Sequence, residues 1–106
     1  MNKRYDKYAE IYKALGDINR LMIVDMLTEG ELCACKILEK FEISQPTLSH
    51  HMKTLCACGL VKGRKQGKWT YYSISAEGGK KAAAMLQKIS NSDRTKNETK
   101  NKGCDE

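Results

Sequence analysis

Residues 44–55 read SQPTLSHHMKTL, and the spacing of polar and apolar residues in this segment predicts a helix. Ser44 or Gln45 can cap a helix, and Pro46 falls in its first turn, where a missing N–H costs no hydrogen bond. Three apolar residues recur at i, i+4 and i+7, which places them on one side of the helix: Leu48, Met52 and Leu55. Gly59 is suited to end the helix. We therefore predict a helix with one apolar face packed against a core.

The opposite face of this helix is polar. At 100° per residue it presents the following side chains: Pro46, Thr47, Ser49, His50, Lys53 and Thr54. Small hydroxyls, an imidazole and a lysine can contact base edges and phosphates in the major groove of DNA. A solvated helix face can have the same composition, so the neighbouring elements must decide between the two interpretations.

The residues after this helix favour contact with DNA. Two β-prone runs, residues 60–65 and 68–74, flank Gln66-Gly67 and predict a β-hairpin. The hairpin tip is expected to carry three cations: Arg64, Lys65 and Lys68. A wing of this kind would bring its cations to the phosphate backbone.

Helical periodicity predicts the remaining elements. Helices are expected at residues 5–15, 18–28, 32–41 and 76–89, and Asp17 can cap the second of them. The predicted fold class is therefore mainly α (α+β). It is a winged helix-turn-helix with about five helices and a two-stranded β-hairpin wing.

The chain is expected to form a single domain. Residues 1–89 would hold the DNA-binding and dimerisation domain, and residues 90–106 a polar, disordered tail. The first and last helices carry more apolar surface than a small monomer needs to expose: Tyr5, Tyr8, Tyr12, Met85, Leu86 and Ile89. We therefore expect a homodimer that pairs through these two helices.

The charge distribution points to a polyanionic partner. The net charge is +6, and no acidic residue lies between Glu42 and Glu77. That window holds seven basic or imidazole side chains: His50, His51, Lys53, Lys62, Arg64, Lys65 and Lys68. A solvated basic face is the alternative, but cations without interleaved acids favour binding to DNA phosphates.

Composition excludes several classes of protein. The chain of 106 residues has no run near the ~20 apolar residues of a membrane helix. Its start has no apolar export segment and it has five cysteines, an odd number, so we expect the reducing cytoplasm. No phosphate loop, Ser-His-Asp set, carboxylate pair or Cys-x-x-Cys motif is recognisable, so we expect no enzyme.

Four segments together carry a family pattern. They are Glu31-Leu32-Cys33-Ala34-Cys35, the stretch 44–55, Cys58-Gly59-Leu60-Val61 and Gly67-Lys68-Trp69-Thr70-Tyr71-Tyr72. With Leu15-Gly16-Asp17-Ile18-Asn19-Arg20-Leu21, they resemble the ArsR/SmtB family of metal- and metalloid-responsive repressors over residues 8–89. The resemblance implies a homodimeric repressor that leaves its operator, a duplex inverted repeat, when thiolates capture an inducer.

The resemblance also implies an inducer site. Arsenic-sensing members carry Cys-x-Cys at the start of the third helix, which Cys33 and Cys35 match, and no permanent cofactor is implied. Many members add a third cysteine where this chain has Leu38. Arsenite or antimonite uses three thiolates, whereas a monosubstituted organoarsenical needs two, so both classes of trivalent inducer stay open.

The other cysteines have two interpretations. On a regular helix, side chains two residues apart point about 200° from each other. Cys33 and Cys35 can therefore share an ion only at a helix start, where the backbone can unwind. Cys56 and Cys58 form a second Cys-x-Cys, which is either packing or an accessory thiol site. Cys104 in the tail is expected to be a bystander, with delivery of a third sulfur by the tail as the alternative.

A redox switch and a Cd- or Zn-responsive repressor are the alternatives to an arsenical sensor. In each case the residues expected to contact DNA are the same: Ser44, Gln45, Thr47, Ser49, His50, Lys53, Arg64, Lys65 and Lys68.

Overall fold

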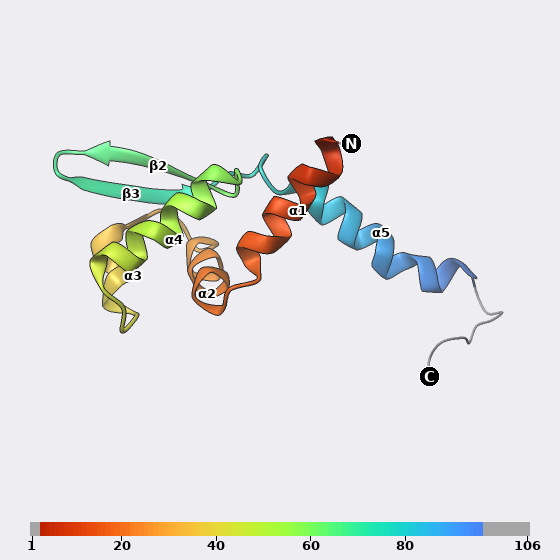
Figure 1. Cartoon of the computed structure of the whole chain (residues 1–106), viewed down its shortest axis with the longest axis horizontal. Coiled ribbons are helices and arrows are strands. Elements are labelled where there is room, and N and C mark those ends of the chain that lie inside the picture. Colours follow the sequence, from red (N-terminus) through yellow and green to blue (C-terminus); the bar gives the residue numbers. More distant parts are fainter. Residues whose placement is uncertain (1–2, 97–106) are drawn as a thin grey trace.

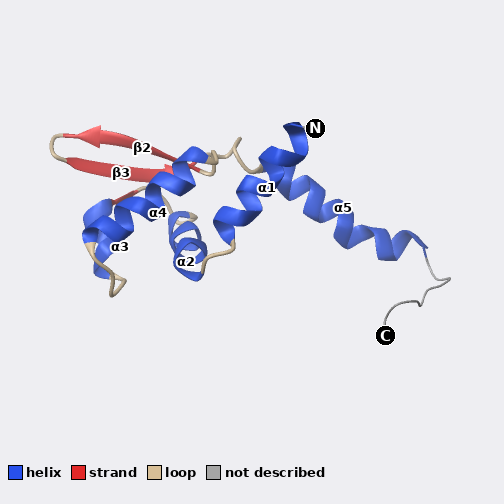
Figure 2. Ribbon diagram, in the orientation of Figure 1, coloured by secondary structure: helices blue, strands red, loops and turns tan. Residues whose placement is uncertain are grey.

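A computed structural model of the chain describes residues 3–96 (Figures 1 and 2). Within them lie the helices α1 (Lys3–Leu15), α2 (Ile18–Leu27), α3 (Ala34–Glu39), α4 (Gln45–Ala57) and α5 (Lys80–Lys96). The strands are β1 (Leu32–Cys33), β2 (Val61–Gln66) and β3 (Trp69–Ile74). The predicted winged helix-turn-helix is confirmed, with one strand more than the sequence indicated.

The core forms around α4, as its apolar spacing predicted. Leu48, Met52 and Leu55 are all buried, and they pack with Ile23 of α2 and Ile37 of α3. The helix begins where the sequence placed it, since the Ser44 hydroxyl accepts the backbone N–H of Thr47 at 3.2 Å. Burial of one face leaves the other face of α4 on the surface.

The sheet has the order β1-β3-β2. Strands β2 and β3 form the predicted hairpin, in which Val61 is opposite Ile74 and Gln66 is opposite Trp69. Gly67 closes the turn with a φ of 66°, a backbone conformation that favours glycine.

The prediction of a helix at residues 32–41 is wrong for its first residues. Leu32 and Cys33 form β1 instead, paired antiparallel with Tyr72 and Tyr71 of β3. Two residues are too short for a periodic signal, so only their pairing with β3 fixes them as a strand. The helix itself then spans six residues, Ala34–Glu39.

The last helix also departs from its predicted bounds. It begins at Lys80, four residues after the expected Ala76, because the chain makes a tight turn through Gly78. A Cβ atom on Gly78 would collide with the carbonyl oxygen of Gly59, so the turn packs backbone against backbone. The helix ends at Lys96 and so extends into the segment expected to be a disordered tail, since residues 90–96 include no glycine or proline to stop it. Residues 97–106, with Cys104, lie outside the described residues.

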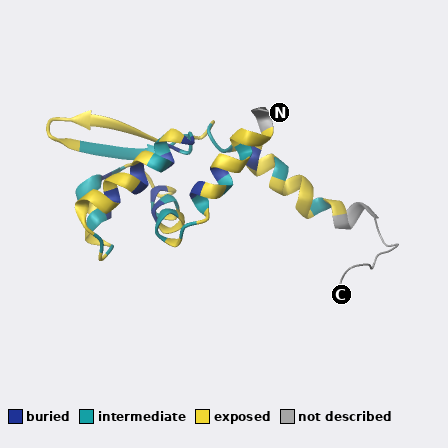
Figure 3. Cartoon of the chain, viewed as in Figure 1, coloured by how far each residue is buried: buried dark blue, intermediate teal, exposed yellow. Residues whose placement is uncertain are grey.

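Helix α5 projects from the body of the molecule (Figures 1 and 3). Its first part packs on α1, where the Tyr12 hydroxyl donates to the carbonyl oxygen of Ala82 at 2.7 Å. Beyond that contact, Leu86 and Ile89 are 52% and 59% exposed, and Tyr5 of α1 is 50% exposed. No helix in residues 3–96 is long and apolar enough to cross a membrane.

Candidate functional site

Cys33 and Cys35 come together at the start of α3. Cys33 is the N-cap residue, with extended backbone angles (φ −68°, ψ 145°), and its sulfur accepts the backbone N–H of Cys35 at 3.3 Å. The two Sγ atoms are 2.7 Å apart. The extended N-cap therefore overcomes the divergence expected on a regular helix, and both thiols can reach one ion.

The two thiols differ in acidity. The pKa of Cys33 is lowered from its ordinary value, chiefly because the Cys35 thiol donates a hydrogen bond to its sulfur. Hydrogen bonds from the backbone N–H groups of Cys35 and Lys36 lower this pKa further. The hydrogen bond between the two thiols raises the pKa of Cys35, which holds the donated proton. Cys33 is thus the first thiolate of the pair.

The pair offers two ligands. Residues 3–96 contain no cluster of three or more His, Cys, Asp or Glu side chains that could hold a metal ion. Leu38, one turn after Cys35, is partly buried and packs against the core. Within the described residues of one chain, the site therefore supplies two sulfur ligands.

The polar face of α4 is open to solvent. Six residues that the sequence assigned to DNA contact are exposed there: Ser44, Gln45, Thr47, Ser49, His50 and Lys53. The Ser44 hydroxyl is also engaged locally, because it donates to the Thr47 hydroxyl at 2.9 Å. We call these six exposed residues the α4 face.

The wing cations are not equivalent. Lys68 lies in the turn and Lys65 near it, opposite Thr70, and both are exposed. Arg64 was expected at the tip, but it lies within β2, opposite Tyr71. Its guanidinium carbon is 4.9 Å from the centre of the Tyr71 ring.

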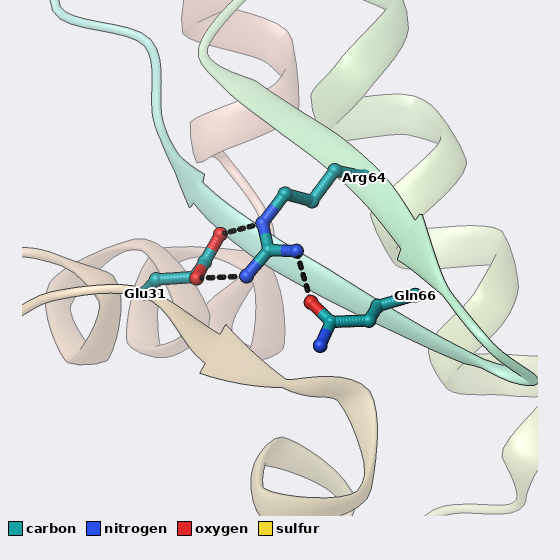
Figure 4. Close-up of polar contacts among 3 residues, drawn as sticks. All are labelled: Glu31, Arg64 and Gln66. Carbon is teal, nitrogen blue, oxygen red and sulfur yellow. Dashed lines mark hydrogen bonds and ion pairs between the residues drawn. The ribbon is translucent and has the colours of Figure 1, made fainter.

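Arg64 is held by an acidic partner, as Figure 4 shows. Its Nε and Nη2 donate to the two carboxylate oxygens of Glu31, each at 2.9 Å, and its Nη1 donates to Gln66. Arg64 in turn lowers the pKa of the Glu31 carboxyl, chiefly through this hydrogen bond. Since Glu31 immediately precedes β1, this ion pair ties the strand that carries Cys33 to the wing.

Residues 17–62 match the bacterial regulatory proteins described as the arsR family. The arsenical resistance operon repressor of Staphylococcus aureus is 51% identical over 71 residues, which cover 67% of this chain and 68% of that repressor. The chain belongs to the ArsR family. Members are transcriptional regulators and not enzymes, as the sequence analysis expected.

Two further relatives bear on the inducer and on assembly. A homolog of the cadmium resistance regulatory protein CadC of Staphylococcus aureus is 44% identical over 70 residues, 65% of this chain and 58% of that protein. A homodimeric winged helix-turn-helix domain from Mycobacterium bovis, described as a possible ArsR-family regulator, superposes with a TM-score of 0.68. It is 27% identical, and the match covers 94% of this chain and 92% of that domain.

The second Cys-x-Cys of this ArsR-family chain lies in a different environment. Cys58 is buried, and its thiol donates to the carbonyl oxygen of Leu55 at 3.3 Å. Burial, and then the neighbouring Cys58, raise the pKa of Cys56. Both features favour packed thiols over metal-binding ligands.

Sequence reasoning missed two polar contacts in this ArsR-family fold. His51 lies on the buried face of α4, and its Nδ1 is 3.1 Å from Nη1 of Arg20 in α2. Arg20 also donates from Nε to the carbonyl oxygen of Ala14, so it links three helices. This contact and the Glu31–Arg64 pair join residues more than thirty positions apart, so no local pattern could reveal them.

Proposed function

We propose that this ArsR-family chain is a cytoplasmic homodimer that represses transcription until Cys33 and Cys35 capture a trivalent arsenical. The observation that carries the proposal is the 2.7 Å approach of the two sulfurs at the N-cap of α3. Soft thiolates prefer soft acceptors such as trivalent arsenic and antimony. The resemblance to arsenical resistance repressors supports the same inducer class.

The DNA-bound form of the repressor would use the α4 face and the wing. The exposed hydroxyl, imidazole and lysine groups of α4 would enter the major groove, with Lys65 and Lys68 on the flanking phosphates. Arg64 would contribute less to phosphate binding, because Glu31 already offsets its charge. Two copies paired through α1 and α5 would meet an inverted repeat whose half-sites are spaced by helical turns.

Capture of the inducer can reach the DNA-binding surface by a short route. Cys33 pairs with Tyr71 in the sheet, and the Tyr71 ring lies beneath Arg64. The turn between α3 and α4 connects the other thiol to the α4 face. We therefore expect a change at the thiol pair to act on both the wing and α4.

A cadmium- or zinc-responsive repressor is the second candidate, favoured by the relative from a cadmium resistance system. A structural zinc site takes four ligands, and the described residues bring together two thiols. Such a sensor would need ligands from a partner subunit or from residues 97–106. The redox alternative requires a disulfide between cysteines only two residues apart, which closes a strained loop.

A competition series separates these candidates. Release of a labelled operator duplex is measured against arsenite, an organoarsenical, antimonite, Cd²⁺, Zn²⁺ and peroxide. We expect release by trivalent arsenicals or antimonite at concentrations well below those of the other agents. Release by Cd²⁺ or Zn²⁺ alone, or by peroxide alone, would replace the proposed inducer with the corresponding alternative.

A further inference from the structure

A groove of about 380 Å³ lies beside the thiol pair. It is bounded by α3, the first half of α4 and the start of β3, and Cys35 forms part of its wall. Its apolar and aromatic lining comes from five further side chains: Leu38, Leu48, Met52, Trp69 and Tyr72. An apolar cavity of about 150 Å³ is large enough to bind benzene, so this groove has room for an aromatic ring.

The number of thiols indicates what kind of arsenical fits. A monosubstituted arsenical, R–As(OH)₂, reacts with two thiols to form two As–S bonds while two As–O bonds break. The two thiol protons leave with the hydroxyl groups as water, and arsenic stays trivalent with its As–C bond intact. Cys33 and Cys35 satisfy this acceptor completely, whereas arsenite bound to the same pair keeps one hydroxyl.

We propose that the groove binds the organic substituent of a monosubstituted trivalent arsenical, with an aryl group preferred, while Cys33 and Cys35 hold the arsenic. This inference rests on the proposed function, because it assumes that the thiol pair captures arsenic. It adds a second recognition element, since Trp69 is 45% exposed and presents apolar ring surface within reach of such a group. Covering that surface favours an aryl substituent over a methyl group.

The location of the groove also connects the substituent to DNA release. Ser49 of the α4 face and Lys68 of the wing both line it. A ring in the groove therefore lies next to two proposed DNA contacts. It also lies between α4 and the wing, which must both contact the duplex. Larger substituents should displace α4 from the wing more effectively than small ones.

The test compares substituents on matched variants. Half-release concentrations for a labelled operator are measured with arsenite, methylarsonous acid and phenylarsonous acid. The full chain is compared with Trp69→Leu, which removes the aromatic surface, and with Trp69→Phe, which keeps it. Because Trp69 begins wing strand β3, operator affinity without inducer is measured for every variant, and the phenyl-to-methyl ratio of half-release concentrations is taken within each variant.

For the unmodified chain, we expect the half-release concentration of phenylarsonous acid to be at least about tenfold lower than that of methylarsonous acid. Trp69→Leu should reduce this phenyl-to-methyl preference about threefold or more, and Trp69→Phe should retain it. Intrinsic differences between the two arsenicals in thiol affinity cancel in this comparison. As a second variant, Leu38→Trp should fill the groove and raise the phenylarsonous acid concentration needed for release.

Two results overturn the inference in distinguishable ways. If all three arsenicals release DNA and the phenyl-to-methyl preference is the same in all variants, the groove does not bind the substituent, while the proposed function stands. If none of the arsenicals releases DNA, the proposed function fails and the ligand assigned to the groove fails with it. Trp69 is the single tryptophan of the chain, so its fluorescence gives an independent readout. Phenylarsonous acid should shift its emission more than arsenite does.

Discussion

Arg64 and Glu31 form a two-pronged ion pair, with both N–H···O distances at 2.9 Å, between the wing and the residue that precedes β1. The pair offsets the charge of Arg64, which lies in the acid-free sequence window and was expected to contact DNA. It also fixes the wing relative to the strand that carries Cys33. The wing is therefore braced by this pair, and we propose that Lys65 and Lys68, which are exposed at its tip, supply its main contacts with DNA phosphates.

Removing the acidic partner should change the salt dependence of DNA binding. In Glu31→Gln the Arg64 guanidinium loses its carboxylate and becomes available to a phosphate. We expect tighter binding to any duplex and a steeper plot of log affinity against log salt, by up to about one unit. Fluorescence anisotropy on operator and random DNA measures both slopes. Adding Arg64→Gln should remove the gain, and a gain that survives this second change would contradict the account.

Lys65 and Lys68, the cations nearest the tip of the wing, should behave differently from Arg64. Lys65→Gln and Lys68→Gln are each expected to flatten the salt slope by about one unit, because each removes one phosphate contact on all sequences. Arg64→Gln should flatten it by less, since Glu31 already compensates its charge. Equal effects from all three substitutions would mean that the Glu31–Arg64 pair opens on DNA.

The hydrogen bond between the thiols predicts a pH dependence. Because Cys35 stabilises the Cys33 thiolate, a first thiolate should appear as pH rises through a value below the ordinary cysteine range. Arsenical capture should accelerate over the same interval and level off above it. Ultraviolet thiolate absorbance and stopped-flow capture rates measure the two curves. Cys35→Ala should move the first thiolate to higher pH, and Cys56→Ala, the matched control, should leave it in place.

The exposed apolar residues of α5 predict the dimer interface. Leu86→Lys and Ile89→Lys should each weaken self-association about tenfold or more, because a charge would replace apolar surface buried between protomers. Gln87→Lys, on the same helix, is the control and should have little effect. Sedimentation at micromolar concentration reports the outcome. A chain that is monomeric before any substitution would exclude the interface.

Local patterns predicted the parts of this fold that local chemistry determines. Leu48, Met52 and Leu55 repeat at helical spacing, Ser44 is a strong capping residue, and Gly67 closes a hairpin, so α4 and the wing followed from the sequence. The Cys-x-Cys spacing likewise located the thiol pair at a helix start. These features depend on neighbours within a few residues.

Features that depend on distant pairing could not be predicted. Strand β1 exists because Leu32 and Cys33 pair with β3, nearly forty residues later. The Glu31–Arg64 pair depends on that same pairing, and the burial of His51 depends on Arg20. The groove beside Cys35 needs three elements to close around it, so it had no signature in the sequence.

We propose that Cys33 and Cys35 alone convert arsenical capture into DNA release. To test this, the labelled operator complex is titrated with arsenite and with phenylarsonous acid, using Cys33→Ser, Cys35→Ser and Cys56→Ser chains. Serine keeps the shape but supplies no soft thiolate, and neither Cys33 nor Cys35 lies on the α4 face. The account predicts normal operator binding by all three variants, loss of release in the first two, and release retained in Cys56→Ser. Dissociation of Cys33→Ser and Cys35→Ser from DNA at the arsenical concentrations that release the unmodified chain would contradict it.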